Sequence, residues 1–133
     1  MDLNDEERLR LLLAPARLKS MTNSKDLEVM GNEDIMRLML RSTRESYAQG
    51  FDGVRQDGKV MCTDFGFRLE DIRDDLPVQL WYGKQDTFVP LVQGVQIAAR
   101  VGGIADLRVV DETHASISTN LKKEVLEEIL KKM

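Results

Sequence analysis

The sequence predicts an α/β fold in which a helical region, residues 1–59, precedes a βαβα unit with two parallel strands, residues 60–133. Two short runs rich in β-branched and aromatic residues predict the strands, PVQLWYG at 77–83 and ADLRVV at 105–110. Apolar residues at helical spacing follow each run. This alternation favours a parallel sheet, because two parallel strands need a long crossover, which a helix usually provides.

Two helical patterns fill the N-terminal region. DEERLRLLLAPARL at 5–18 places leucines at helical spacing, and Pro15 is expected to end this helix. GNEDIMRLMLRSTRESYAQG at 31–50 carries a start and a stop signal, with Asn32 as the N-cap and Gly50 beyond the last turn. The methionines and leucines of this second helix form a broad apolar face, which we interpret as core packing.

The remaining segments are assigned from turn residues and periodicity. Residues 50–77 repeat glycine and aspartate and are expected to form a loop, with LEDI at 69–72 as a short helical turn. A helix is expected from Pro90 to Gly102. A last helix is expected over THASISTNLKKEVLEEILKKM at 113–133.

Composition narrows the class of protein. The chain has 133 residues, the length of one domain, of which 42% are apolar and 32% charged, as in soluble globular proteins. Its 23 acidic and 19 basic residues give a net charge of −4, which argues against nucleic acid and anionic membrane surfaces as partners. No apolar run approaches the ~20 residues that span a bilayer, so no membrane segment is expected.

Residue types also bear on cofactors and compartment. Cys62 is the single cysteine, which excludes an internal disulfide and a zinc site built from cysteines. One histidine and scattered acidic residues predict no metal site and no cofactor. The acidic start MDLNDEER is unlike a secretory signal or a transit peptide, so a cytoplasmic location is expected.

Two residues able to do chemistry follow the two predicted strands. Asp86 comes just after the strand that ends at Gly83, and His114, the single histidine, comes after the strand that ends at Val110. Because the carboxyl ends of parallel strands meet at one edge of a sheet, we expect these two side chains to lie within reach of each other. A carboxylate orients an imidazole and stabilises its protonated form, which a general base beside a hydroxyl nucleophile requires.

Simpler interpretations of both residues stay open. Asp86 stands where it would cap the helix that begins near Val89. A lone histidine such as His114 is more often a surface or structural residue than a general base. The equivalent placement of the two residues at two strand ends is what favours the acid–base interpretation.

One part of the chain resembles a known family. The matching residues are GFRLEDI at 66–72, LPVQLWYGKQDTFVP at 76–90, Gly94 and Ala98 in the following helix, and ADLRVVDETHASI at 105–117. They resemble the carboxyl-terminal part of α/β-hydrolases. The resemblance implies a partial α/β-hydrolase fold, with Asp86 as the acid and His114 as the base of a Ser-His-Asp triad, behind a cap-like region at 1–59. It implies hydrolysis of an ester, amide or similar bond in a small-molecule substrate, with no cofactor or metal.

The chain departs from the family pattern in two ways. Thr113 stands where a glycine commonly precedes the histidine, and its β-branched side chain restricts the backbone, so we expect the loop to sit differently. The Gly-x-Ser-x-Gly nucleophile motif is absent, because none of the serines at 20, 24, 42, 46, 116 and 118 has glycines two residues away on both sides. The oxyanion-hole loop is absent too.

Three hypotheses remain after these observations. The chain is a fragment of a larger hydrolase, or a non-catalytic interaction protein derived from one, or one half of a split enzyme whose serine lies on another polypeptide. A two-stranded sheet also leaves unpaired strand edges, which favour association. We therefore expect a homo-oligomer or a complementing chain at the open sheet edge.

Overall fold

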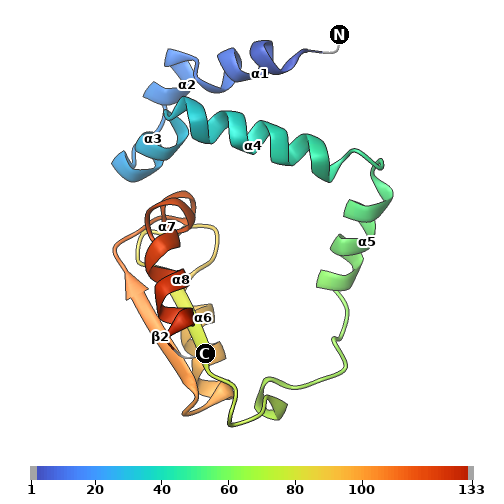
Figure 1. The fold of residues 1–133 in the computed structure, drawn as a ribbon, viewed down its shortest axis with the longest axis vertical. Helices are drawn as coiled ribbons and strands as arrows, with labels where there is room; N and C mark the ends of the chain where they lie inside the picture. The colour runs from blue at the N-terminus through green and yellow to red at the C-terminus, as the bar shows by residue number, and fades with distance from the viewer. Residues whose placement is uncertain (1–2, 132–133) are drawn as a thin grey trace. The chain divides into compact units, whose positions relative to one another are not determined.

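The computed structural model describes residues 3–131, and the chain divides into two compact units, Met1–Gly66 and Phe67–Met133. The first unit is helical, and the second holds a small sheet with helices packed on it (Figure 1). The predicted combination of a helical N-terminal half with two parallel strands in the C-terminal half is confirmed. The division between the two parts, predicted after residue 59, lies after Gly66 in the structure.

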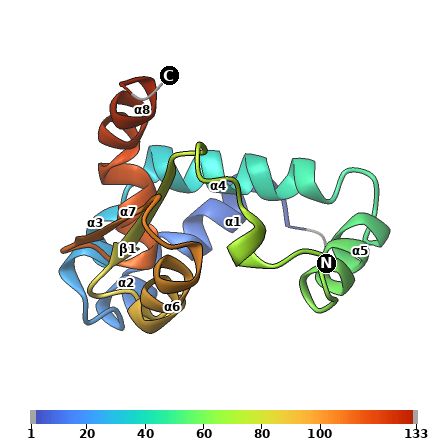
Figure 2. The same cartoon turned by 90° about the horizontal axis from the view of Figure 1, so that it is seen from below.

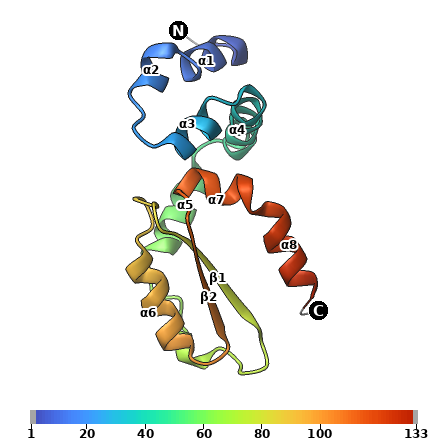
Figure 3. The same cartoon turned by 90° about the vertical axis from the view of Figure 1, so that its left-hand side faces the viewer.

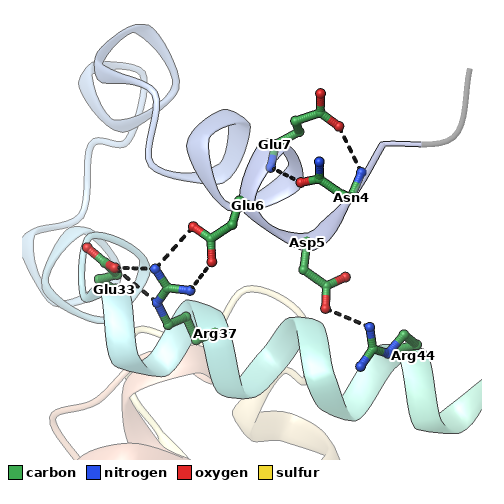
Figure 4. Close-up of polar contacts among 7 residues, drawn as sticks. All are labelled: Asn4, Asp5, Glu6, Glu7, Glu33, Arg37 and Arg44. Carbon is green, nitrogen blue, oxygen red and sulfur yellow. Dashed lines mark hydrogen bonds and ion pairs between the residues drawn. The ribbon is translucent and has the colours of Figure 1, made fainter.

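The first unit contains the helices α1 Asp5–Leu12, α2 Pro15–Lys19, α3 Ser24–Met30, α4 Glu33–Ser46 and α5 Asp52–Met61. The helices α1 and α4 each begin with a side-chain cap. At α1, the side-chain oxygen of Asn4 accepts from the Glu7 N–H at 3.0 Å, and the Asn4 N–H donates to the Glu7 carboxylate at 2.8 Å (Figure 4). At α4, the predicted cap Asn32 accepts from the Ile35 N–H at 3.1 Å. These bonds satisfy N–H groups that have no partner within the helix.

Ion pairs join α1 to α4 on the surface of the first unit. Asp5 pairs with Arg44 at 2.8 Å, and Glu6 pairs with Arg37 at 2.5 Å (Figure 4). Arg37 also binds Glu33 of its own helix at 2.8 Å. Exposed pairs of this kind contribute about 0–1 kcal/mol each. The buried side chains of α1 and α4 therefore matter more to the stability of this helix pair.

Three helices of the first unit differ from the sequence-based expectation. The first helix ends before Pro15 as predicted, at Leu12, but Pro15 then begins a separate helix, α2, because its fixed φ suits a first helical turn. The short helix α3 carries no strong periodic signal and was not predicted. The predicted loop at 50–77 is also wrong in part, since α5 lies inside it, beyond the C-terminal end of α4 (Figures 1 and 2). Gly53 and Gly58 each lower the helix propensity by about 1 kcal/mol relative to alanine, so the sequence pattern does not indicate α5.

The second unit is built on two parallel strands. Its elements are the 3₁₀ turn η1 Leu69–Asp71, β1 Val78–Gly83, α6 Leu91–Val101, β2 Ala105–Val110, α7 His114–Asn120 and α8 Lys122–Leu130. The register pairs Val78 with Ala105 at one end and Gly83 with Val110 at the other. Since the strands pair over their full length, the loops that follow Gly83 and Val110 leave the sheet side by side.

Helices α6 and α8 lie on opposite sides of this sheet (Figure 3). On the α6 side, the ring of Tyr82 packs so closely on Gly94 that a Cβ there would lie 2.6 Å from the ring. On the α8 side, the Gln79 amide donates to the backbone oxygen of Glu128 at 3.3 Å, and Arg108 pairs with the Glu128 carboxylate at 2.6 Å. The period-two alternation of a strand explains why Tyr82 and Gln79 face different helices.

The predicted C-terminal helix is broken into α7 and α8, with Leu121 between them (Figure 3). The Ser118 hydroxyl donates to the Ala115 oxygen, and the Thr119 hydroxyl donates to the Ser116 oxygen at 3.0 Å. Hydroxyl groups that bond the backbone in this way compete with the helical ladder and bend helices. Residues 132–133, at the end of the predicted helix, lie outside the described part of the chain.

A large share of the apolar surface stays in contact with solvent. Large apolar side chains among the exposed residues include those of Phe51, Met61, Phe65 and Phe88. Among residues 3–131 the buried apolar side chains are those of Leu9, Val29, Met36 and Val101. None of the helices in that range is both long enough and apolar enough to cross a membrane.

Candidate active site

The candidate site lies where the two strands end. The Lys84 N–H donates to the Val110 oxygen at 2.8 Å, and the Gln85 N–H donates to the Glu112 oxygen at 3.0 Å. The Gln85 side chain adds a bond to the Asp111 carboxylate at 2.7 Å. These three bonds continue the pairing of the strands into the loops. The loop after β1 and the loop after β2 are therefore fixed to each other before either reaches its functional side chain.

Gly83 allows the two loops to come this close. A Cβ built on Gly83 would lie 2.3 Å from the backbone oxygen of Glu112 and 3.4 Å from the Cβ of Asp86. The first distance is shorter than any real contact, and the atom it meets belongs to the backbone. The glycine that ends the predicted strand thus has a second role, because any side chain there would force the loop carrying His114 away from the loop carrying Asp86.

Asp86 uses both oxygens of its carboxylate. Oδ1 accepts from the N–H groups of Phe88 and Val89, at 2.8 and 2.9 Å. Oδ2 lies 3.0 Å from Nδ1 of His114. The side chain is only 7% exposed. Asp86 therefore does accept backbone N–H groups, as a cap would, but these groups belong to the loop ahead of α6. Its second oxygen contacts the imidazole as well.

The charge state of Asp86 follows from these contacts. Burial of the carboxyl raises its pKa, but hydrogen bonds from the Val89 N–H and from His114 outweigh that effect. The net result is a pKa below the ordinary value of 3.8. At neutral pH the group is therefore an anion, which accepts hydrogen bonds from its partners and stabilises a positive charge on the imidazole.

His114 is the first residue of α7, and its side chain is 54% exposed. One ring nitrogen faces the Asp86 anion, so this nitrogen, Nδ1, carries the proton that the carboxylate accepts. The neutral ring then has its lone pair on Nε2. The ring of Phe88 lies 5.3 Å from the imidazole, centroid to centroid. Among residues 67–131 of the second unit, no hydroxyl forms a hydrogen bond with the His114 ring.

A buried hydroxyl network surrounds the start of α7. Thr113 is 2% exposed and Ser116 is fully buried. The Ser116 N–H donates to the Thr113 hydroxyl at 3.1 Å, and the Thr113 N–H donates to the Ser116 hydroxyl at 2.8 Å. The Ser116 hydroxyl in turn donates to the carboxylate of Glu112. The backbone at Thr113 is extended, with φ −93° and ψ 177°, a conformation that suits a β-branched residue.

The structure brings together the two residues that the sequence singled out, Asp86 and His114, at one end of the sheet. Their catalytic role stays a prediction. Sequence reasoning missed Phe88 and the hydroxyl pair of Thr113 and Ser116. The spacing of that pair is the signal that was available, because hydroxyl residues three positions apart at a helix start form a capping box.

Metal ions require a group of ligand side chains, which the described residues do not provide. Over residues 3–131, no three histidine, cysteine, aspartate or glutamate side chains are grouped so that they could hold a metal ion.

No family model, no curated protein and no solved structure matches this chain.

Proposed function

We propose that this chain carries the acid and the base of a Ser-His-Asp hydrolase, with His114 as the general base and Asp86 as its carboxylate partner. The supporting observation is the 3.0 Å contact between His114 Nδ1 and Asp86 Oδ2. Its substrates would be esters, amides or related acyl compounds. The serine nucleophile would lie outside residues 1–133, in a longer form of the chain or on a partner chain.

In this reaction, the lone pair on His114 Nε2 takes the proton of the serine hydroxyl as the oxygen attacks the acyl carbon. The imidazolium that results is stabilised by the Asp86 anion at Nδ1. The same proton then passes to the leaving alcohol or amine when the bond to the acyl carbon breaks. A water molecule repeats these steps to release the acid and restore the serine.

The geometry fits this role better than it fits an incidental surface ion pair. An exposed pair leaves both side chains free to reorient, and its net contribution is about 0–1 kcal/mol. Here the N–H groups of Phe88 and Val89 hold one carboxylate oxygen and so fix the direction of the other. The carboxylate is buried, while the imidazole is half exposed and open to a reactant. That combination of a fixed acceptor with an accessible base is what general base catalysis needs.

Ester hydrolysis by the protein from its natural source tests the proposal. The protein would be tagged and purified under native conditions, so that any continuation or partner chain is retained, and assayed with p-nitrophenyl esters. Asp86→Asn keeps an oxygen for the loop N–H groups but removes the negative charge from His114. We expect this variant to lose roughly 10⁴-fold in turnover, as when the charge is removed from an intact triad. An unchanged rate in both Asp86→Asn and His114→Ala would overturn the proposal.

A second candidate function is supported by a separate observation. The side chains of Val92 and Val95 on α6 are 58% and 50% exposed, and those of Leu126 and Leu130 on α8 are 52% and 68% exposed. Apolar residues in such positions favour association. The alternative is therefore a non-catalytic interaction protein. It predicts a discrete complex by analytical ultracentrifugation, together with no loss of any measured activity when His114 is replaced by alanine.

A further inference from the structure

We propose that the buried hydroxyl pair of Thr113 and Ser116 acts as a positioning device for His114. The inference rests on the proposed function, since it assigns to these residues the task of holding the base against its carboxylate. The hydroxyl pair sets the direction of the imidazole, and without it Nδ1 of His114 leaves Oδ2 of Asp86.

The position of His114 between the two hydroxyl residues is the first argument. Thr113 is the N-cap of α7, His114 is the first helical residue, and Ser116 closes the first turn. The reciprocal bonds between Thr113 and Ser116, at 2.8 and 3.1 Å, fix the backbone on both sides of His114. A third bond joins their two hydroxyl oxygens at 3.0 Å. The side chain of the first helical residue has its direction set by that turn.

The connection to the strand ends is the second argument. The Ser116 hydroxyl donates to the carboxylate of Glu112, which also accepts from Asn120 in the last turn of α7. The backbone oxygen of Glu112 accepts from the N–H of Gln85, in the loop that carries Asp86. A continuous set of hydrogen bonds thus runs from the loop of the acid to the helix of the base. Glu112 belongs to both parts of this set, and its backbone oxygen can approach the first loop because Gly83 has no side chain.

Burial is the third argument. Ser116 is fully buried and Thr113 is 2% exposed, whereas the capping residues Asn4 and Asn32 of α1 and α4 are exposed. Water cannot replace a lost partner at a buried site, so a missing hydroxyl leaves the opposing polar groups unsatisfied. The first turn of α7 must then move to find new partners. Because the imidazole is attached to that turn, the movement carries Nδ1 away from the carboxylate.

The tautomer of neutral His114 reports this contact without any need for enzymatic activity. The Asp86 anion selects the ring with the proton on Nδ1, and ¹⁵N chemical shifts of the imidazole distinguish that form from the Nε2–H form. His114 is the single histidine of the chain, so its two ring nitrogens are assigned without ambiguity. Asp86→Asn serves as the reference, because an amide N–H facing Nδ1 turns that nitrogen into an acceptor and should produce the Nε2–H tautomer.

The variants separate positioning from stability. Thr113→Val removes the hydroxyl at nearly constant volume, and Ser116→Ala removes the other hydroxyl. Thr113→Ser keeps the hydroxyl but deletes a buried methyl group. We expect the melting temperature to fall in all three. The Nδ1–H tautomer should lose its majority in Thr113→Val and Ser116→Ala, and it should keep that majority in Thr113→Ser.

Each outcome has one meaning. If Asp86→Asn switches the tautomer and neither Thr113→Val nor Ser116→Ala does so, the positioning proposal is overturned while the acid–base pair stands. The positioning proposal is likewise overturned if Thr113→Ser loses the Nδ1–H tautomer together with Thr113→Val, since loss of stability alone would then explain the effect. If Asp86→Asn leaves the tautomer unchanged, the contact itself is refuted, and the proposed function falls with it. Should Ser116→Ala fail to fold, the pair Thr113→Val and Thr113→Ser decides the question.

Discussion

The backbone of Gly83 passes so close to Glu112 that a Cβ on Gly83 would lie 2.3 Å from the Glu112 carbonyl oxygen. Both residues belong to segments where the chain leaves the sheet, and the oxygen already accepts the N–H of Gln85. This contact makes the two strand ends one rigid edge. It is the reason that residues far apart in the sequence, Asp86 and His114, lie at hydrogen-bond distance.

Gly83→Ala should destabilise the second unit by about 1–3 kcal/mol, because the new methyl group meets a backbone oxygen that the Gln85 N–H already holds. Trp81, the single tryptophan, lies on β1 and reports urea unfolding of this unit by fluorescence. Gly58→Ala is the matched control, since nothing lies within 4 Å of a Cβ there. That control should stabilise α5 by roughly 1 kcal/mol and raise the helical circular dichroism. Equal effects of the two changes would contradict the account.

Gly94→Ala should also destabilise, although alanine is normally favoured over glycine in a helix by about 1 kcal/mol. The Cβ would lie 2.6 Å from the ring of Tyr82, so the ring has to move. In a Tyr82→Leu background the obstacle is gone, and the same glycine change should then cost less or become favourable. Urea unfolding of the four proteins gives the coupling energy. A coupling of zero would mean that Tyr82 does not pack on α6.

Asp86→Ala should cost about 1–2 kcal/mol of stability, because it removes the acceptor of two loop N–H groups as well as the partner of His114. Asp86→Asn retains an oxygen for the N–H groups of Phe88 and Val89, and it should cost less than half of that. Thermal unfolding of the two variants measures the difference. If they lost the same stability, the loop bonds would contribute nothing.

Acid should release Arg108 from Trp81. Arg108 stacks over the Trp81 ring at 4.7 Å and pairs with Glu128 and with Asp106. Hydrogen bonds from Lys131 and then from Arg108 lower the pKa of Glu128 from 4.5 to about 2. Because the pKa is lower in the folded chain, the stabilisation by Glu128 is complete above pH 4.5 and is lost as the pH falls through 2.

The fluorescence of Trp81 between pH 5 and pH 2 tests this expectation. The wild-type chain should show a transition at the acid end of that range, as Glu128 takes up its proton. Glu128→Gln removes the titrating group, so its curve should be flattened. Glu124→Gln, on an exposed residue of the same helix, should leave the curve unchanged. A transition that persists in Glu128→Gln would assign the effect to other carboxylates.

The sequence located the parts of the second unit that depend on local pattern. Both strands were predicted, because VQLWYG and ADLRVV are β-rich runs bounded by turn residues. The parallel connection then placed Asp86 and His114 at one edge without any knowledge of side-chain contacts. Topology of this kind is predictable because strands that alternate with helices are typical of a parallel sheet with helical crossovers.

Features that depend on tertiary contact or on weak propensity were not predictable. Helix α5 contains Gly53 and Gly58, so its pattern resembles a loop. The break at Leu121 follows a turn of α7 in which Ser118 and Thr119 hydroxyls bond the backbone, and periodicity does not register such bonds. Gly83 lies close to Glu112, and Ser116 forms buried bonds, only because two loops are in contact. The sequence pattern does not indicate that contact.

Fluorophosphonate labelling tests the central claim most directly, because this reagent forms a covalent bond with a serine that a histidine base activates. The protein from its natural source would be labelled under native conditions, and the modified residue identified by mass spectrometry. We expect one labelled serine outside residues 1–133, with labelling that falls by roughly 10⁶-fold in His114→Ala. Labelling that is absent from the wild-type material, or that persists unchanged in His114→Ala, would contradict it.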